Sequence, residues 1–409
     1  MILSLLVEPM KRDLLLTDTQ FSLLQGFAFA ILYTFAGLPL GRLIDRTNRI
    51  RIVAFGVAFW SIATSICGVA SHYWQLFLAR VGVGVGEATL SPAAYSIFAD
   101  SFEPRRLGLA LGVFNVGAAV GGGIAMIIGG YVVQAMAQMD DVVLPVIGQI
   151  HAWQLTFLVI GPPGIIVALL VAWLREPARH GQLRAGVAEG LVSIPLKEVM
   201  GFVNQHRVSL GFHHLGTGVS HMAAFGAIAW TPVLLVRVHD WPADRIGMAM
   251  GLALIGGGVL GFIGGGWLGD VLNRRRPTLG RLQVGLIAAL IALPAAMVFS
   301  LQPNAYLTVV LLGFIYMCAA GNFPSAVAVL NELAPNQMRG QLSALFLCII
   351  NLIGLGLGAT LVALGSDYLF PGETGLRYSL AVITPIGFIL SAISFRLSFR
   401  PFERSMAAV

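Results

Sequence analysis

The stretch that decides the fold is GRLIDRTNRIR, residues 41–51, because the chain contains its pattern twice. The second copy, GWLGDVLNRRR at residues 266–276, lies 225 residues later, and both follow G-x-x-x-D-x-x-N-R-x-R. Further landmarks match at an offset of 232, which pairs Pro92, Asp100 and Gly108 with Pro324, Glu332 and Gly340. Two matched landmarks at nearly one offset predict a duplicated structural unit.

Almost everything around the two copies is apolar. Of the 409 residues, 57% are hydrophobic and only 11% are charged, whereas a soluble domain carries about 25% charged residues. A membrane-spanning helix needs about 20 residues. Stretches of that length predict an all-α polytopic membrane protein with spans at 20–41, 52–70, 76–99, 107–133, 153–174, 208–236, 246–268, 282–300, 306–333, 342–364 and 378–399.

The first seven residues, MILSLLV, are too few to cross a bilayer. We expect them to end a first helix that begins upstream of Met1, because half a helix would leave backbone groups unpaired in lipid. With that partial span, two six-helix bundles related by a pseudo-two-fold are predicted, at 1–174 and 207–409. Residues 175–206 connect them. PLKEVMGFV within this connector forms either a short helix on the membrane surface or an ordinary solvated segment.

The basic residues orient the chain. Nineteen of the 25 lysines and arginines fall on one side of the predicted spans and five on the other, with Arg80 inside a span. The side rich in positive charge is predicted to be cytoplasmic, together with the C-terminus. This asymmetry accounts for the net charge of +6, so nucleic acid is not an expected partner. The three cysteines lie in apolar stretches with no metal-binding spacing, and we expect no metal or cofactor.

The duplicated loop predicts a cytoplasmic gate. Gly41 permits close helix contact, while Asp45 lies at a helix end, where it can accept hydrogen bonds from the N-terminus of a helix in the other half. Asp270 is its counterpart. In the alternative interpretation these are solvated loop charges. The basic residues assigned to the same gate are Arg46, Arg49, Arg274, Arg105 and Arg106.

The duplicated loop and the six-plus-six layout resemble the major facilitator superfamily over essentially the whole chain. Three stretches resemble its Spinster-type lipid transporters in a bacterial form: LSLLVEPMKRDLLLTDTQFSLLQGFAFAILYTFAGLPLGRLIDR, ARVGVGVGEATLSPAAYSIFADSFEPRRLGLALGVFNVGAAVG and NRRRP. The resemblance implies transport of lysophospholipids or sphingoid phosphates, often with proton coupling, in a bacterial inner membrane. That family also carries an acidic–basic pair in its first span, ahead of the point where this sequence begins. Either translation starts upstream of Met1, as we expect, or this chain lacks that proton-coupling carboxylate.

A charged pair inside an apolar span marks the candidate transport site. Arg80 and Glu87 lie in FLARVGVGVGEATLSPAAY, residues 77–95. Seven residues are almost two helical turns, so both side chains point the same way, about 10 Å apart along the axis. Charged groups inside spans are costly and usually line a cavity. At the offset of 232 the two positions become Leu312 and Ala319, so the fold does not require charges there.

We therefore assign Arg80 to an anionic headgroup and Glu87 to proton coupling; the alternative is a structural pair that joins helices. The G-x-G-x-G run at 82–86 lies inside a helix, and it predicts close helix packing rather than a nucleotide loop. Further substrate contacts are predicted at polar positions of other spans, with interhelical hydrogen bonds as the alternative. These positions are Tyr33, Gln25, Asn115, His221 and Asn322.

The leading functional hypothesis is a monomeric secondary transporter of an amphiphilic anionic lipid, which works by alternating access and is coupled to protons. The runner-up is a proton-coupled multidrug or small-metabolite antiporter of the same superfamily. We do not expect an enzyme, because the sequence has no His-Glu metal box and no G-x-S-x-G elbow. A receptor or channel would be indicated by an absence of substrate turnover.

Overall fold

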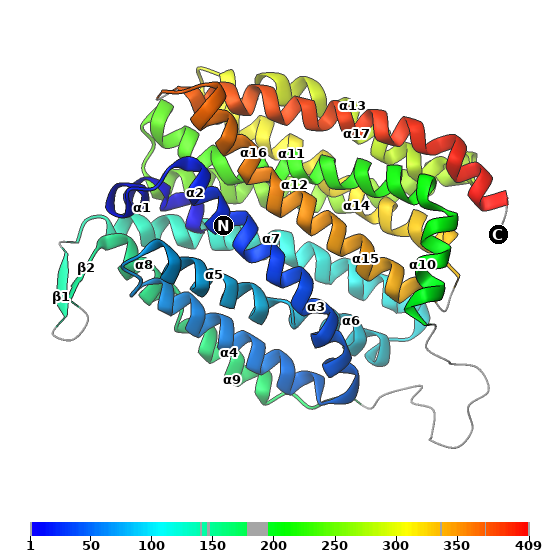
Figure 1. Cartoon of the computed structure of the whole chain (residues 1–409), viewed down its shortest axis with the longest axis horizontal. Helices are drawn as coiled ribbons and strands as arrows, with labels where there is room; N and C mark the ends of the chain where they lie inside the picture. The colour runs from blue at the N-terminus through cyan, green and yellow to red at the C-terminus, as the bar shows by residue number, and fades with distance from the viewer. Residues whose placement is uncertain are drawn as a thin grey trace. The chain divides into compact units, whose positions relative to one another are not determined.

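The computed structural model describes residues 2–139, 141–144, 148–177, 195–335, 338–372 and 374–407, with some side chains of α3, α6, α7 and neighbouring segments left out. The chain is mostly helical (Figure 1). The elements of the first half are η1 (Ile2–Leu5), α1 (Val7–Leu14), α2 (Asp18–Ser22), η2 (Leu23–Phe27), α3 (Ala28–Arg46), α4 (Arg49–Cys67), α5 (Tyr73–Glu87), α6 (Leu90–Ser101), α7 (Pro104–Met136), β1 (Val142–Leu144), β2 (Gly148–Ile150), α8 (Ala152–Ile160) and α9 (Pro163–Ala172).

The remaining elements follow the connector. They are α10 (Leu196–Gln205), α11 (Arg207–His239), α12 (Ala243–Arg275), α13 (Gly280–Val298), η3 (Phe299–Leu301), α14 (Ala305–Leu333), α15 (Arg339–Asn351), η4 (Leu352–Leu357), α16 (Gly358–Leu364), η5 (Gly365–Leu369) and α17 (Gly375–Ala407). The label η marks short helices that are not α-helices: η1 and η3 are 3-10 helices, and η2, η4 and η5 are π-helices.

The all-α membrane architecture is confirmed. Within the described residues, nine helices are long and apolar enough to cross a membrane. The predicted span at 20–41 is also helical, as α2, η2 and α3 in succession. The span at 76–99 is not continuous, because α5 ends at Glu87 and α6 begins at Leu90. Between them the Thr89 hydroxyl donates to the Gly86 carbonyl at 2.8 Å, a side-chain bond of the kind that competes with helical pairing.

Two connecting segments add structure to the predicted spans. The PLKEVMGFV stretch does form a helix, α10, and its Val199 is buried in a core cluster with Leu210, Phe346 and Phe402. A two-stranded antiparallel hairpin follows α7, with Val142 opposite Ile150. The span pattern carried no signal for this hairpin.

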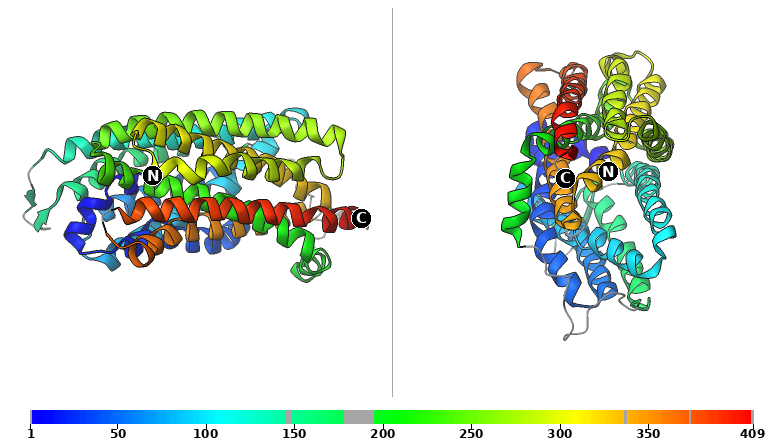
Figure 2. Two further views of the ribbon diagram at one scale, coloured as in Figure 1. Left: turned by 90° about the horizontal axis from the view of Figure 1, so that it is seen from above. Right: turned by 90° about the vertical axis from the view of Figure 1, so that its right-hand side faces the viewer.

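Contacts group the chain into two compact units. Unit 1 comprises Met1–Arg179, Ile228–Leu252 and Ala359–Ser379, and unit 2 comprises His180–Ala227, Ala253–Gly358 and Leu380–Val409. Unit 1 therefore contains the first half together with nearly all of α16, the whole of η5 and one end each of α11, α12 and α17. The boundary predicted between the six-helix bundles remains a prediction. In unit 2, α13 and α14 run side by side (Figure 2).

Glycines set the closest helix contacts inside unit 1. A Cβ on Gly130 of α7 would lie 2.9 Å from the Cα of Gly247 on α12, so any larger side chain would force these helices apart. Close by, the backbone N–H of Ala243 donates to the Gln134 side chain at 3.2 Å. These contacts hold the start of α12, which belongs to the second half of the sequence, against a helix of the first half.

Candidate functional site

The glycines of α5 position the candidate site in unit 1. A Cβ on Gly84 would lie 2.8 Å from the Phe29 carbonyl of α3, and a Cβ on Gly86 would lie 2.9 Å from the Gly56 carbonyl of α4. Side chains at these positions would separate the backbones, so the run at 82–86 serves helix packing, as predicted. The close approach brings the aromatic residues of α3 against the charged residues of α5.

Aromatic residues of α3 lie near both Arg80 and Glu87. Among the described residues no hydrogen bond or ion pair connects the two side chains, in agreement with their predicted separation. The Arg80 guanidinium lies 5.8 Å from the centre of the Phe29 ring, which stacks on Tyr33 at 5.4 Å between centroids. Tyr33 hydrogen-bonds Ser91 and lies within electrostatic range of Glu87.

Arg80 and Glu87 can each still bind a further partner. The Arg80 Nε is buried without a described hydrogen-bond partner, although a buried donor left unpaired destabilises a fold by about 1–3 kcal/mol. Glu87 is accessible at the surface of its helix although protein surrounds it on most sides, and the charge of Arg80 acts on its carboxylate. A cation with a free donor, an accessible carboxylate and two aromatic rings can hold an amphiphilic anion and exchange a proton.

Gln25 lies on the π-helix η2, directly before α3, the helix that carries Phe29 and Tyr33. Its Nε2 donates to the Ala229 carbonyl at 3.5 Å, while its Oε1 is buried without a described partner. Single-turn π segments inside helices are frequent at functional sites. Asn115 is half-buried on α7 in the same unit.

The remaining predicted substrate contacts belong to unit 2. His221 of α11 bonds the Thr217 carbonyl through Nδ1 at 2.9 Å and lies between the rings of Phe225 and Phe323. Asn322 of α14 is almost fully buried, and its Nδ2 has no partner among the described residues. The candidate residues thus form one set in each unit.

The described residues of the predicted gate belong to two clusters, in each of which one arginine pairs with two carboxylates. Arg49 is buried at the start of α4, where it pairs with Asp100 and, at 2.6 Å, with Glu176. In unit 2 Asp270 accepts from Arg281 at 3.1 Å, and Arg281 also pairs with Glu332. Arg274 is exposed. The side chains of the other predicted gate residues, Gly41, Asp45, Arg46, Arg105 and Arg106, lie outside the described part.

Arg281 was missed, although the sequence carried a signal for it. Arg49 and Asp100 are 51 residues apart, as are Arg281 and Glu332. Both members of the pair are therefore related by the offset of 232, whereas the loop motif aligns Arg49 with Arg274. The paired arginine follows the first glycine of the motif by 15 residues in the second half (Gly266 to Arg281) and by 8 in the first (Gly41 to Arg49), so the motif alone aligns Arg49 with a different arginine.

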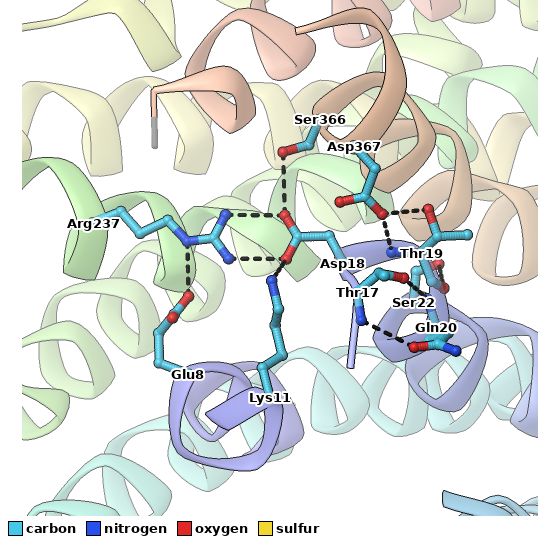
Figure 3. Close-up of polar contacts among 10 residues, drawn as sticks. All are labelled: Glu8, Lys11, Thr17, Asp18, Thr19, Gln20, Ser22, Arg237, Ser366 and Asp367. Carbon is cyan, nitrogen blue, oxygen red and sulfur yellow. Dashed lines mark hydrogen bonds and ion pairs between the residues drawn. The ribbon is translucent and has the colours of Figure 1, made fainter. Parts of the chain in front are cut away.

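A second polar cluster, at the predicted external end of unit 1, was also missed (Figure 3). Asp18 accepts two hydrogen bonds from the Arg237 guanidinium, both of 2.9 Å, and others from Lys11 and Ser366. Arg237 also donates to Glu8 at 2.7 Å. Nothing in the span pattern predicts this cluster, because its members are distant in sequence and lie at the ends of spans.

The same cluster fixes the first half of the chain to the second. Asp367 of η5 accepts from the backbone N–H and the hydroxyl of Thr19, at 2.7 and 2.6 Å. A cavity of about 600 Å³ is lined in part by Asp18, Arg237 and Asp367. Asp18 lies ahead of the predicted span; burial raises the pKa of its carboxyl, but the hydrogen bonds and charges of Arg237 and Lys11 outweigh burial and hold that pKa below its ordinary value.

The comparison with known families decides the class. Residues 1–359 and 213–407 match the family described as Major Facilitator Superfamily. The chain belongs to the major facilitator superfamily. It is a multi-pass transport protein of the membrane and not an enzyme. Over 409 residues it is 27% identical to an MFS-type efflux pump of Mycolicibacterium smegmatis, a match that covers 98% of this chain and 89% of that one.

Spinster-type proteins are similar in sequence and in fold. The chain is 32% identical to protein spinster homolog 1 of Xenopus tropicalis over 161 residues, which are 38% of this chain and 30% of that protein. A crystal structure of a bacterial homologue of the human lysosomal transporter Spinster, inward-facing and occupied, superposes with a TM-score of 0.77 at 23% identity. That likeness covers 100% of this chain and 93% of the other, and it confirms the major facilitator fold.

Proposed function

We propose that this superfamily member is a secondary active transporter of an amphiphilic anionic lipid, of the lysophospholipid or sphingoid-phosphate class, coupled to protons. It works as a monomer in a bacterial inner membrane, with its C-terminus in the cytoplasm. Arg80 binds the headgroup and Glu87 carries the proton. Tyr33, Gln25 and Asn115 in unit 1, with His221 and Asn322 in unit 2, supply further contacts.

One observation carries the proposal: a half-buried arginine, whose buried Nε has no described partner, lies beside the same aromatic residues of α3 as an accessible glutamate. A fixed arginine offers a planar fork that suits phosphate. The rings of Phe29 and Tyr33 beside it suit the apolar part of an amphiphile. Binding an anion at Arg80 changes the field at Glu87, which gives a route for coupling between substrate and proton.

In this proposal the polar cluster around Asp18 and Arg237 closes the external side of the transporter. Asp18 and Arg237 join α2 to α11, and Thr19 and Asp367 join α2 to η5. Opening the external side requires these bonds to break, and the polar groups then meet water in the neighbouring cavity. We expect Arg237→Gln to raise the accessibility of a cysteine placed at Ser22 to an external, membrane-impermeant thiol reagent.

The test of function is uptake of lysophosphatidylglycerol into proteoliposomes under an imposed pH gradient. Wild type should accumulate the lipid, Glu87→Gln should lose the dependence on the gradient, and Arg80→Gln should lose uptake. Glu198→Gln, a neutralised carboxylate on α10, is the matched control and should behave as wild type. Gradient-driven uptake that persists in Glu87→Gln would make Glu87 a structural residue.

A multidrug or small-metabolite antiporter is the second candidate. The relative matched over nearly the whole chain is named an efflux pump, and the same charged pair serves a proton antiporter. Ethidium efflux measured in the same proteoliposomes separates the two. Efflux that depends on Glu87 and ignores lysophosphatidylglycerol as a competitor would favour the antiporter over the lipid transporter.

A further inference from the structure

A groove of about 420 Å³ lies between α3 and α4, with α5 as its floor. Both helices pack along α5, but they touch one another little, which leaves the space open. Val85 and Gly86 line it from α5. At 100° per residue, Glu87 points roughly 150° away from the middle of that pair. The groove therefore lies on the side of α5 opposite to the proposed transport site.

The groove is apolar along its length. Leu40 and Leu43 form one wall, and Ile52, Phe55 and Phe59 form the other. Phe55 is 71% exposed and stacks on Phe59 at 6.2 Å between ring centroids. At the floor, Gly56 and Gly86 bring α4 and α5 into backbone contact without filling the space above them. Walls of this kind suit a single hydrocarbon chain.

Among the described residues that line the groove, Arg51 is a cation with no described ion pair. Arg51 is exposed in the first turn of α4, and no described carboxylate pairs with it. Its neighbour Arg49 is instead occupied by Asp100 and Glu176. Two other described polar groups at the mouth are hydrogen-bonded: the Asn48 Oδ1 accepts from the Arg51 backbone N–H at 2.8 Å, and the Thr47 hydroxyl donates to the Leu43 carbonyl at 2.7 Å.

We infer that this groove binds an anionic phospholipid of the cytoplasmic leaflet, with one acyl chain between α3 and α4 and the phosphate on Arg51. The leaflet rests on the orientation given under the proposed function, whereas the site itself is separate from the transported substrate. An apolar channel with a cation at the membrane surface is complementary to an anionic lipid. The bound lipid takes the place of the direct packing that α3 and α4 lack, next to the loop that joins them.

The test is photolabelling of the full chain in phosphatidylcholine nanodiscs that contain phosphatidylglycerol with a diazirine in its acyl chain. We expect the label to concentrate in peptides covering residues 40–59. Arg51→Gln should lower that labelling about fivefold, the loss expected for one basic residue at a charged membrane surface. Arg51→Lys should retain it, and Arg12→Gln, an exposed arginine at the predicted external end, should match wild type.

Three outcomes would overturn the inference. Labelling of 40–59 that is unchanged in Arg51→Gln would show ordinary contact with the surrounding bilayer. Equal labelling by a diazirine phosphatidylcholine would show that charge plays no part. Labelling that disappears in Arg80→Gln would assign the groove to the transport path. Absence of lysolipid uptake with the label intact would instead remove the proposed function and leave the lipid site standing.

Discussion

The two arginine–carboxylate pairs of the repeat have the same sequence spacing but very different surroundings. The Arg49 side chain is 1% exposed and its partners Asp100 and Glu176 are 13% and 20% exposed. The Arg281 side chain is 25% exposed, and its partners Glu332 and Asp270 are 24% and 64% exposed. Arg49 also donates to the hydroxyl and the carbonyl of Ser96. Duplication thus preserved the pair, while the surroundings of each copy diverged.

The additional carboxylate bound by each arginine explains the difference in burial between Arg49 and Arg281. Asp270 belongs to the loop motif itself, eleven residues before Arg281. Glu176 comes from the beginning of the connector, and it also accepts from the backbone N–H of Ile50. In the first half the arginine therefore fixes the chain that leaves the bundle, and this chain covers it. Burial makes such a pair costly to break, because the partner charges would remain without compensation.

The largest effect is expected from Arg49→Gln. Removing the buried cation leaves two carboxylates unpaired, which should destabilise the protein by about 3–5 kcal/mol. Denaturant titration of the purified protein in detergent, followed by tryptophan fluorescence, measures this change. Arg51→Gln, two residues away and exposed, is the control and should stay near wild type. A loss below about 1 kcal/mol would mean that the first pair is no stronger than an ordinary surface pair.

A double-mutant cycle isolates the first pair. Combining Arg49→Gln with Asp100→Asn should give a coupling free energy near the upper end of the range of about 0.5–3 kcal/mol for residues in one network. A cycle on the exposed pair of the second half, Arg281→Gln with Asp270→Asn, should give about 0.2–1 kcal/mol, because Asp270 is solvated. Equal couplings in the two cycles would contradict the contrast in burial.

Arg281→Gln alone should have an intermediate effect. Its partner Glu332 is partly covered while Asp270 faces solvent, so we expect a loss of about 1–2 kcal/mol, between surface and buried pairs. Raising the salt concentration should shrink this loss more than that of Arg49→Gln, because exposed charges are screened more strongly. The same denaturant titration, repeated at two ionic strengths, provides the check.

The smallest effect is expected from Arg274→Gln. The loop motif makes Arg274 the counterpart of Arg49, but the structure gives that role to Arg281 and leaves Arg274 exposed. Its replacement should change the free energy of unfolding by less than about 0.5 kcal/mol. A loss comparable to that of Arg281→Gln would restore the alignment drawn from the loop motif.

Much of the fold could be predicted because it depends on local composition. Apolar length gave the spans, and the duplicated loop gave the repeat and the superfamily. The glycines at 82–86 were also predictable as packing residues, since their spacing places them inside a helix. The break in the helix after Glu87 could not be predicted, because it accompanies a hydrogen bond from the Thr89 hydroxyl to the Gly86 carbonyl.

The candidate site divides in the same way. Arg80 and Glu87 stood out because charge is costly in a span, and their common direction followed from helical spacing. The intervening Phe29 and Tyr33 could not be found from the pattern, because aromatic residues in a span are ordinary. Only the close approach of α3 to α5 at Gly84 brings those rings near the two charges.

The sequence by itself determined that this chain is a membrane-embedded transport protein with duplicated halves and a charged pair in one of them. It could do so because the hydrophobic effect and the cost of charge in lipid act on each segment separately. Tertiary structure decided which arginine pairs with Glu332, and it assembled Asp18 and Arg237. It also left a groove beside Arg51. These features join residues from distant helices, so they exist only once the helices have packed.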